Sequence, residues 1–407
     1  MVELSISPGV SSETMSFLGI QSTLDPLWPR VTSLTLGNKL GWDAVKSTLA
    51  FLSPRIKNLT LALPRDNSIL LQPTLSTVSN RCNSLQKLVL DVVADDPHFI
   101  HWVGRLISAY RDTLRTLEVS SPFKAEHLPI IANLTRLRNL KLERVHLSSD
   151  LPLDAFPALE EITFVHCHGQ RLQHFFERLC TTGLKVVKIY AADAITFKEP
   201  ITGLSRFSTT LRDLQITGVA DLVLPSVIVP HLFASLNTVH LECLRREGNN
   251  TGAPCAFRPT DRAITELAAA MPNVTHLSLG SPGCSDLRCT TFPSLVTLSK
   301  TCKDLDTLVI KVDFQTIVAP SLHKNQDIET DAILDGTQGS ACKLRKLVVG
   351  VSPLPNNPES VWIVAIGLGK IFPSLFEVVG YGSEGTRWKQ VSKNIRILRQ
   401  VHRSVQQ

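Results

Sequence analysis

Apolar residues recur along this chain at fixed offsets from one another. In the stretch from Leu137 to Leu142, an anchor leucine is followed by Leu140 at +3 and Leu142 at +5. The apolar–x–apolar ending is the period-2 pattern of a short strand with one buried face. The same arrangement starts at thirteen anchors: Val31, Ile56, Leu85, Leu114, Leu137, Leu159, Leu184, Leu211, Leu236, Val274, Leu305, Leu344 and Leu375. Position +3 is apolar after every anchor, and position +5 is apolar after all but the last, where Gly380 stands.

The distance between anchors sets the size of the repeating unit. Most consecutive anchors lie 22 to 31 residues apart, and the two longer gaps, of 38 and 39 residues, predict inserted loops at 242–259 and 323–340. An L-x-x-L-x-L pattern at such intervals is the signature of leucine-rich repeats, which stack because one unit cannot bury its apolar side alone. We therefore expect an α/β solenoid (horseshoe) of about 13 irregular repeats over residues 28–385. Its curved parallel sheet should line the concave side and its helices the convex side.

The segments that return from one strand to the next predict mainly amphipathic helices. Residues 151–156 are an exception, because two prolines flank them and argue against a full helix. Residues 1–27 are Ser-rich and polar and show no periodicity before Leu24, so we expect a disordered or capping lead-in there. The helices are expected at 42–52, 74–82, 97–110, 126–134, 170–180, 261–271, 292–302 and 359–372.

Residues 386–407 predict one long basic helix. Trp388, Val391, Ile395 and Leu398 follow one another at spacings of three and four, which makes an apolar stripe. Six basic residues cover much of the remainder, and no acidic residue occurs after Glu384: Arg387, Lys389, Lys393, Arg396, Arg399 and Arg403. Two interpretations stay open. The helix can be a C-terminal cap that closes the last repeat, or a basic amphipathic element for an acidic membrane or partner helix.

Charge and composition exclude several classes of protein. The formal net charge is +6, and the residues before this basic helix carry 36 basic and 36 acidic side chains, a balance that argues against a nucleic-acid-binding body. The sequence contains no signal-peptide pattern and no apolar run of about 18 residues, so we expect no membrane span. The nine cysteines form no CxxC pair and favour reduced thiols, with the protein cytoplasmic or nuclear.

Residues that could carry chemistry are few. Cys284 and Cys289 lack a second ligand pair at a suitable distance, and the run His166-Cys167-His168 directly follows a predicted strand. The sequence contains no Gly-rich phosphate loop, no G-x-S-x-G elbow and no HExxH motif. We therefore predict no catalytic, cofactor-binding or metal-binding residues, and a protein that is not an enzyme.

The strand pattern also predicts a binding surface. Positions +3 and +5 point into the core, so positions +2, +4 and +6 point to the concave face. Thirteen strands at about 4.8 Å span roughly 60 Å, a length suited to a protein partner. Solvated strand residues would give the same pattern at any single position, but concave sheets are the surfaces that solenoids use for binding. The predicted partner-binding residues are Glu118, Lys141, Lys188, Tyr190, Gln215 and His240.

Several repeats open with Cys-x-x-Leu or Phe-Pro-x-Leu, as at Cys82, Cys302, Phe156 and Phe372. Over residues 28–385 this resembles the leucine-rich repeat region of F-box proteins, particularly the divergent fungal sets. The resemblance implies a substrate-recognition protein of a ubiquitin ligase, in which an N-terminal F-box binds Skp1 and the repeats hold the substrate. The residues before Val31 contain no F-box motif, so Skp1 and cullin are expected as partners only if an F-box precedes this sequence. The alternative is a structural scaffold in a larger intracellular assembly, without a ligase role.

Overall fold

The computed structural model describes residues 2–6, 30–37, 41–63, 70–92, 99–120, 127–145, 147, 151–168, 171–221, 233–242, 259–280, 290–315, 341–355 and 358–406. The chain forms two compact units, Met1–Tyr190 and Ala191–Gln407, and the division falls within the long strand β8 (Val186–Thr196). Both units are built from the same strand-and-return repeat.

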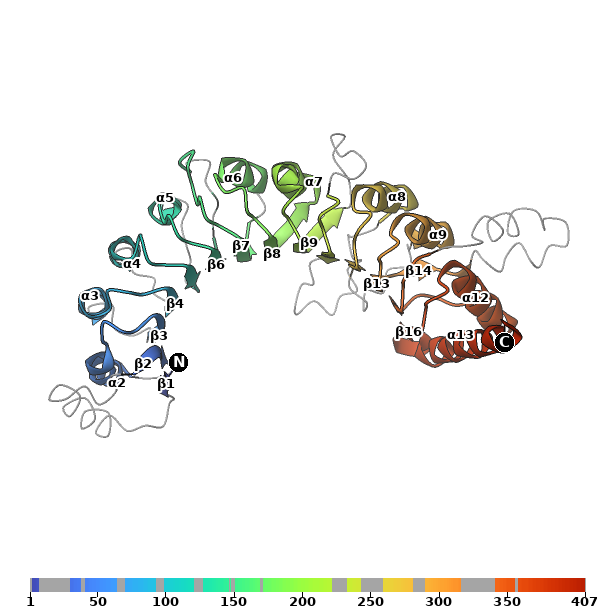
Figure 1. Cartoon of the computed structure of the whole chain (residues 1–407), viewed down its shortest axis with the longest axis horizontal. Coiled ribbons are helices and arrows are strands. Elements are labelled where there is room, and N and C mark those ends of the chain that lie inside the picture. Colours follow the sequence, from blue (N-terminus) through green and yellow to red (C-terminus); the bar gives the residue numbers. More distant parts are fainter. Residues whose placement is uncertain are drawn as a thin grey trace. The chain divides into compact units, whose positions relative to one another are not determined.

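In the first unit the strands follow one another in chain order, from β1 to β8, and each neighbouring pair from β1 to β7 is parallel. The helices lie together on one side of this sheet (Figure 1). The strands before β8 are β1 (Val2–Ile6), β2 (Val31–Leu36), β3 (Asn58–Leu63), β4 (Lys87–Val92), β5 (Thr116–Val119), β6 (Asn139–Glu143) and β7 (Glu161–Cys167). The helices are α2 (Trp42–Thr48), α3 (Leu71–Arg81), α4 (Phe99–Ala109), α5 (Leu128–Ala132) and α6 (Leu172–Arg178).

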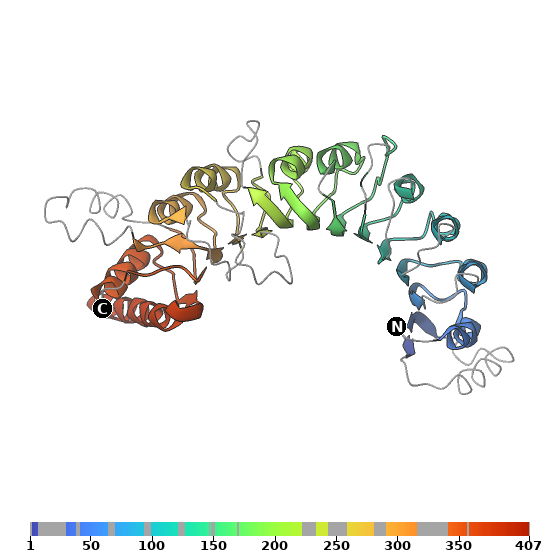
Figure 2. The same ribbon diagram turned by 180° about the vertical axis from the view of Figure 1, so that it is seen from behind.

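The second unit repeats the arrangement, with parallel pairing from β9 through β10, β11, β13 and β15 to β16. The short strands β12 (Thr290–Thr291) and β14 (Val312–Asp313) form a separate pair. Figure 2 shows the sheet and its helices from the other side. The main strands are β9 (Asp213–Asp221), β10 (Thr238–Glu242), β11 (His276–Leu279), β13 (Thr307–Ile310), β15 (Lys346–Gly350) and β16 (Glu377–Gly380). The helices are α7 (Lys198–Leu204), α8 (Asp261–Ala270), α9 (Phe292–Thr301), α12 (Pro358–Ile371) and α13 (Gly385–Gln406).

The buried positions are the ones that the repeat pattern predicts. All thirteen anchors and all thirteen +3 residues are buried, and so is every +5 residue except Gly380. Strand pairing places the same repeat position of neighbouring strands side by side. Leu117 and Leu140, both at +3, are opposite each other, and so are Leu142 and Phe164, both at +5. Each repeat therefore adds one layer to a continuous apolar core. The predicted fold class is confirmed: an α/β leucine-rich repeat solenoid with an open parallel sheet on one side and helices on the other.

Polar groups at the ends of the return segments form hydrogen bonds to the preceding repeat. The backbone N–H of Arg138 donates to the carbonyl of Arg115 at 2.8 Å, and the N–H of Glu160 donates to the carbonyl of Arg138 at the same distance. Similar bonds recur along both units and continue the strand pairing into the loop before each strand. Side chains add to these links, since the hydroxyl of Thr181 donates to the carbonyl of Leu159 at 2.8 Å.

The cysteines that open the Cys-x-x-Leu segments belong to the core. Cys82 and Cys302 are fully buried, and burial is the main reason that the pKa of each thiol rises to about 12. The thiol of Cys342 donates to the carbonyl of Cys302 at 3.3 Å, which links two successive repeats. Thiols that are held protonated in this way are poor nucleophiles and metal ligands, so these cysteines have a structural role.

The structure corrects the interpretation of the N-terminal segment. Val2–Ile6 form a strand that pairs in parallel with β2, from Leu4 opposite Leu34 to Ile6 opposite Leu36. The absence of periodicity before Leu24, and disorder as one of the two expectations for the lead-in, are therefore wrong for these five residues, which form the edge strand of the sheet as a capping segment would. Their apolar–polar alternation is too short to predict a strand alone, and β2 supplies the hydrogen-bonding partner. Residues 7–29 lie outside the described part. So do residues 243–258 of the insertion predicted at 242–259, and the whole insertion predicted at 323–340.

Most predicted helices are present with boundaries shifted by a few residues, and 151–156 contain no helix, as expected. The helix α7 had no counterpart among the predictions. Within the part of the chain that the structure describes, no helix combines the length and the apolar character that crossing a bilayer requires.

Asp261 links two neighbouring repeats of the second unit. Thr260 caps α8, since its side chain accepts from the N–H of Ala263 at 3.2 Å. The carboxylate of Asp261 accepts from the backbone N–H of Thr291 at 2.8 Å and from the hydroxyls of Thr291 and Ser294 at the start of α9. Burial raises the pKa of this carboxyl, but these hydrogen bonds together outweigh burial, and its pKa is lowered.

Replacement of Asp261 by Asn should therefore destabilise the protein by about 1–3 kcal/mol at neutral pH, the range for hydrogen bonds to a charged group. Because the pKa is lower in the folded state, the stabilisation is present above the unfolded value of about 3.8 and is lost as the pH falls through the folded value. The difference between wild type and D261N in urea unfolding should shrink from about pH 7 to about pH 3. The exposed Asp43→Asn variant is the control, and a difference that does not change with pH would contradict this account.

The C-terminal helix α13 packs against α12 and β16. Trp388, Val391 and Ile395 are buried, and the indole N–H of Trp388 donates to the carbonyl of Ser352 at 3.0 Å. A β-carbon added at Gly380 would overlap the indole ring and lie 2.7 Å from Cβ of Trp388. Trp388 therefore fills the space that an apolar +5 residue takes in the other repeats. This burial favours the cap interpretation, while Leu398 is only half-buried.

Candidate functional site

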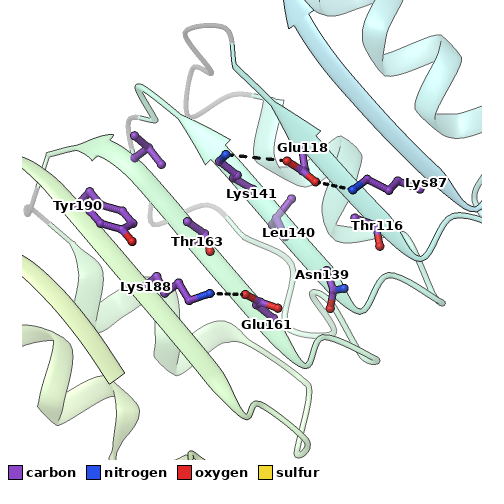
Figure 3. A pocket seen from close by; sticks show the side chains of 11 residues that line it. Lys87, Thr116, Glu118, Asn139, Leu140, Lys141, Glu161, Thr163, Lys188 and Tyr190 are labelled. Atoms are coloured by element: carbon purple, nitrogen blue, oxygen red, sulfur yellow. Dashed lines mark hydrogen bonds and ion pairs between the residues drawn. The ribbon is translucent and has the colours of Figure 1, made fainter. Parts of the chain in front are cut away.

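A hollow of about 560 Å³ opens on the sheet of the first unit, over strands β4 to β8. We call the side of the sheet formed by positions +2, +4 and +6 the open strand face. The hollow lies on this face because the +3 and +5 side chains, on the other side, are packed under the helices. Its lining residues are Lys87, Thr116, Glu118, Asn139, Leu140, Lys141, Glu161, Thr163, Val165, Lys188 and Tyr190 (Figure 3).

The charged side chains of the hollow form two groups of ion pairs. Glu118 accepts from Lys87 at 3.0 Å and lies 3.9 Å from Lys141 (Figure 3). Glu161 accepts from Lys188 at 2.9 Å. All five side chains keep between about a quarter and half of their surface exposed. These pairs contribute little to stability, because exposed ion pairs are weak, but they hold the charges in defined places.

The centre of the hollow is formed by a short side chain. Thr163 on β7 stands opposite Lys141 on β6, and it is only 8% exposed. Lys188 and Tyr190 on β8 bound the other side, so Thr163 is the low point between longer side chains (Figure 3). Lysine ammonium groups, carboxylates, hydroxyls and one aromatic ring thus converge on a few strands. Such a surface can recognise a polar segment of another protein through hydrogen bonds and ion pairs.

The structure brings together four of the six residues predicted to bind a partner. Glu118, Lys141, Lys188 and Tyr190 all line the hollow. Their common position follows from the strand register, because Glu118 pairs with Lys141 and the +4 residues of neighbouring strands fall in one row. Whether they bind a partner remains a prediction.

The other two predicted residues belong to the second unit. Gln215 on β9 is the register partner of His240 on β10. The imidazole Nε2 of His240 lies 3.2 Å from the Glu242 carboxylate, and all three residues are half-buried. These residues form their own polar patch on the open strand face of that unit.

The sequence prediction missed the residues at +2. Lys87, Thr116, Asn139 and Glu161 line the hollow beside the +4 row. The alternation of side chains already places +2 on the same face as +4, so this row could have been included. The pairing of each lysine with a glutamate on a neighbouring strand could not be predicted without the register.

The structure does not support metal binding by the residues considered in the sequence, which are the run His166-Cys167-His168 and the pair Cys284 and Cys289. Cys167 is buried, whereas His166 and His168 are exposed, and Cys284 and Cys289 lie outside the described residues. Among the residues that the structure describes, no group of three or more His, Cys, Asp or Glu side chains could hold a metal ion.

The fold and the hollow define a class: a leucine-rich repeat solenoid with a polar open strand face. No protein-family model matches the chain, and no curated protein matches it. Among solved structures, it is similar to one described as the crystal structure of the Rad7 and Elc1 complex in yeast. The sequence identity is 15% and the TM-score 0.43, over 93% of this chain and 85% of that chain. The fold class rests on the repeat geometry described above.

Proposed function

We propose that this chain is a non-enzymatic protein-binding module whose partner docks on the open strand face. The observation that carries the proposal is the hollow over β4 to β8, where Lys141, Lys188 and Tyr190 surround the low-lying Thr163. An open sheet of parallel strands is the surface that repeat solenoids use for binding. The ion pairs inside the hollow hold polar groups ready for a partner and reduce the ordering that binding would need.

The finer proposal is a substrate-recognition protein of the F-box type in a ubiquitin ligase. The Cys-x-x-Leu and Phe-Pro-x-Leu openings of the repeats support it by resemblance. In this case the partner in the hollow is a substrate, and Skp1 and cullin join only if an F-box segment lies N-terminal to these repeats. The alternative is a scaffold in a larger assembly, which would hold a stable partner and no ligase subunits.

A crosslinking experiment separates these proposals. We would replace Tyr190, at the hollow, by the photo-reactive p-benzoylphenylalanine, and make the same change at the exposed His101 on α4 as a control. Crosslinked proteins would be identified by mass spectrometry. A protein captured from Tyr190 but not from His101 supports partner binding on the open strand face. Skp1 and cullin copurifying with the full-length protein would support the ligase role, and a stable partner without them would support the scaffold.

Reversing two charges in the hollow tests the partner-binding residues. The double variant Lys141→Glu, Lys188→Glu should reduce capture of the partner about tenfold or more, because like charges would face each other across the interface. The melting temperature should stay within about 2 °C, since exposed ion pairs add little stability. Arg105→Glu with Lys198→Glu makes the same change in net charge on exposed positions of α4 and α7 and should leave capture unchanged. Equal capture by both double variants would show that the partner docks elsewhere.

A further inference from the structure

The exposed side of α13 carries basic side chains that form no ion pair with an acidic group of the described residues. Elsewhere in the second unit, charged residues meet across repeats, as Lys343 with Asp304 at 2.7 Å and Lys346 with Glu377 at 3.4 Å. By contrast, Lys389, Lys393 and Arg403 are exposed and form no ion pair with any residue of the described ranges.

Two other arginines of the helix serve the fold instead. Arg387 pairs with Glu384 at 2.9 Å and also donates to the carbonyl of Leu354. Arg399 donates to the carbonyls of Ser374 and Leu375 at 3.3 and 3.2 Å. These contacts hold α13 on the preceding repeat, so the remaining cations are presented from a helix whose orientation is set.

The unneutralised cations form one stripe. Lys389, Lys393, Arg396 and Arg403 follow one another at spacings of four, three and seven, which places them on one side of an α-helix. Arg396 also donates to the carbonyl of Phe376 at 3.3 Å, and it has no ion pair with a described residue. The buried Trp388, Val391 and Ile395 lie outside this stripe and fix which face of the helix is exposed. At about 1.5 Å per residue the 22-residue helix is roughly 33 Å long, a length that suits another helix lying along it.

An apolar edge runs beside this basic stripe. Ile397 and Val401 are one turn apart and are 37% and 57% exposed. Phe376 is 57% exposed, and the guanidinium of Arg396 lies 4.5 Å from its ring centroid. The phosphate backbone of a nucleic acid would leave these apolar side chains without a partner. A bilayer is also disfavoured, because the apolar stripe of Trp388, Val391 and Ile395 that could insert into it is buried in the core. An acidic segment with its own apolar side chains satisfies both features.

We propose that the exposed face of α13 docks an acidic amphipathic helix of a partner protein, with carboxylates on the basic stripe and aliphatic side chains on Ile397 and Val401. This surface is distinct from the hollow in the first unit, so the inference goes beyond the proposed function. One protein could thus hold two partners, or two parts of one partner.

The test uses a synthetic amphipathic peptide of about 20 residues, with glutamates along one helical stripe and leucines beside it. Its binding to the full-length protein would be followed by fluorescence anisotropy. The triple variant Lys389→Glu, Lys393→Glu, Arg403→Glu should weaken binding about tenfold or more, and added salt should weaken wild-type binding, because the attraction is screened. Replacing Val401 by Ser should weaken binding by a smaller factor at all salt concentrations.

The matched control is Arg105→Glu, Lys198→Glu, Lys300→Glu, which changes the net charge equally at exposed positions on α4, α7 and α9. It should bind the peptide like wild type, as should Lys141→Glu, Lys188→Glu, which keeps this test separate from that of the hollow. Failure to bind the peptide, or equal loss in both triple variants, would overturn the proposal. So would an α13-dependent preference for duplex DNA or phosphatidylserine vesicles over the peptide.

Discussion

Replacing Trp388 by alanine should lower the free energy of unfolding of the C-terminal repeats by about 3–5 kcal/mol, the usual cost of removing a large aromatic side chain from a core. Trp388 is fully buried, and its ring meets Phe314 edge-on at a centroid distance of 5.0 Å. Loss of the indole also leaves the carbonyl of Ser352 without its donor. Hydrogen exchange over 358–406 is the suitable measurement, because the loss of a terminal contact in a repeat array can remain local.

A double-mutant cycle with Gly380 makes this prediction sharper. Gly380→Val alone should also destabilise these repeats strongly, since the new side chain would overlap the indole of Trp388. In the Trp388→Ala background the same change should cost much less, because the space is then free. The coupling energy should exceed about 1 kcal/mol, the range for residues in direct contact. Additive effects would show that Trp388 does not occupy the space beside Gly380.

Replacing Leu142 by lysine should unfold the repeats around β6, with a loss of more than about 4 kcal/mol, because the ammonium group would be buried without a partner. Leu142 is fully buried and pairs with Phe164 on β7. Its neighbour Lys141 points to the open strand face, and Lys141→Leu should change stability by less than about 1 kcal/mol. Urea unfolding followed by circular dichroism gives both values. Similar losses in the two variants would contradict the assigned side-chain directions.

The strands after β1 were predictable because their evidence is local and repeated. An anchor followed by apolar residues at +3 and +5 predicts which face of the strand is buried. Because the units are alike, stacking them side by side in a parallel sheet is the arrangement that buries this face in every repeat. The helix α8 was predictable for a similar reason, since Thr260 and the apolar face of the helix both lie within a few residues. β1 was missed because one short alternation of five residues carries too little information without its partner β2.

The position of the hollow could not be predicted from the sequence pattern. The pattern places Lys141 and Lys188 on the open strand face, but it places every other +4 residue there as well. Only the register brings Lys141 beside Glu118 and Thr163, so that a short, nearly buried side chain lies next to longer charged ones.

By itself, the sequence determined the repeat, the buried and exposed positions of each strand, and the basic and apolar stripes of α13, because each depends on residues a few positions apart. Tertiary structure decided which charges neutralise one another and which stay free. Glu118 and Lys87 meet from neighbouring repeats 31 residues apart, whereas Lys389 and Lys393 meet no acidic group among the described residues. It also decided why Gly380 departs from the pattern, since Trp388 returns from the next helix to fill its place. Contacts of this kind form only when distant segments pack, so local periodicity does not encode them.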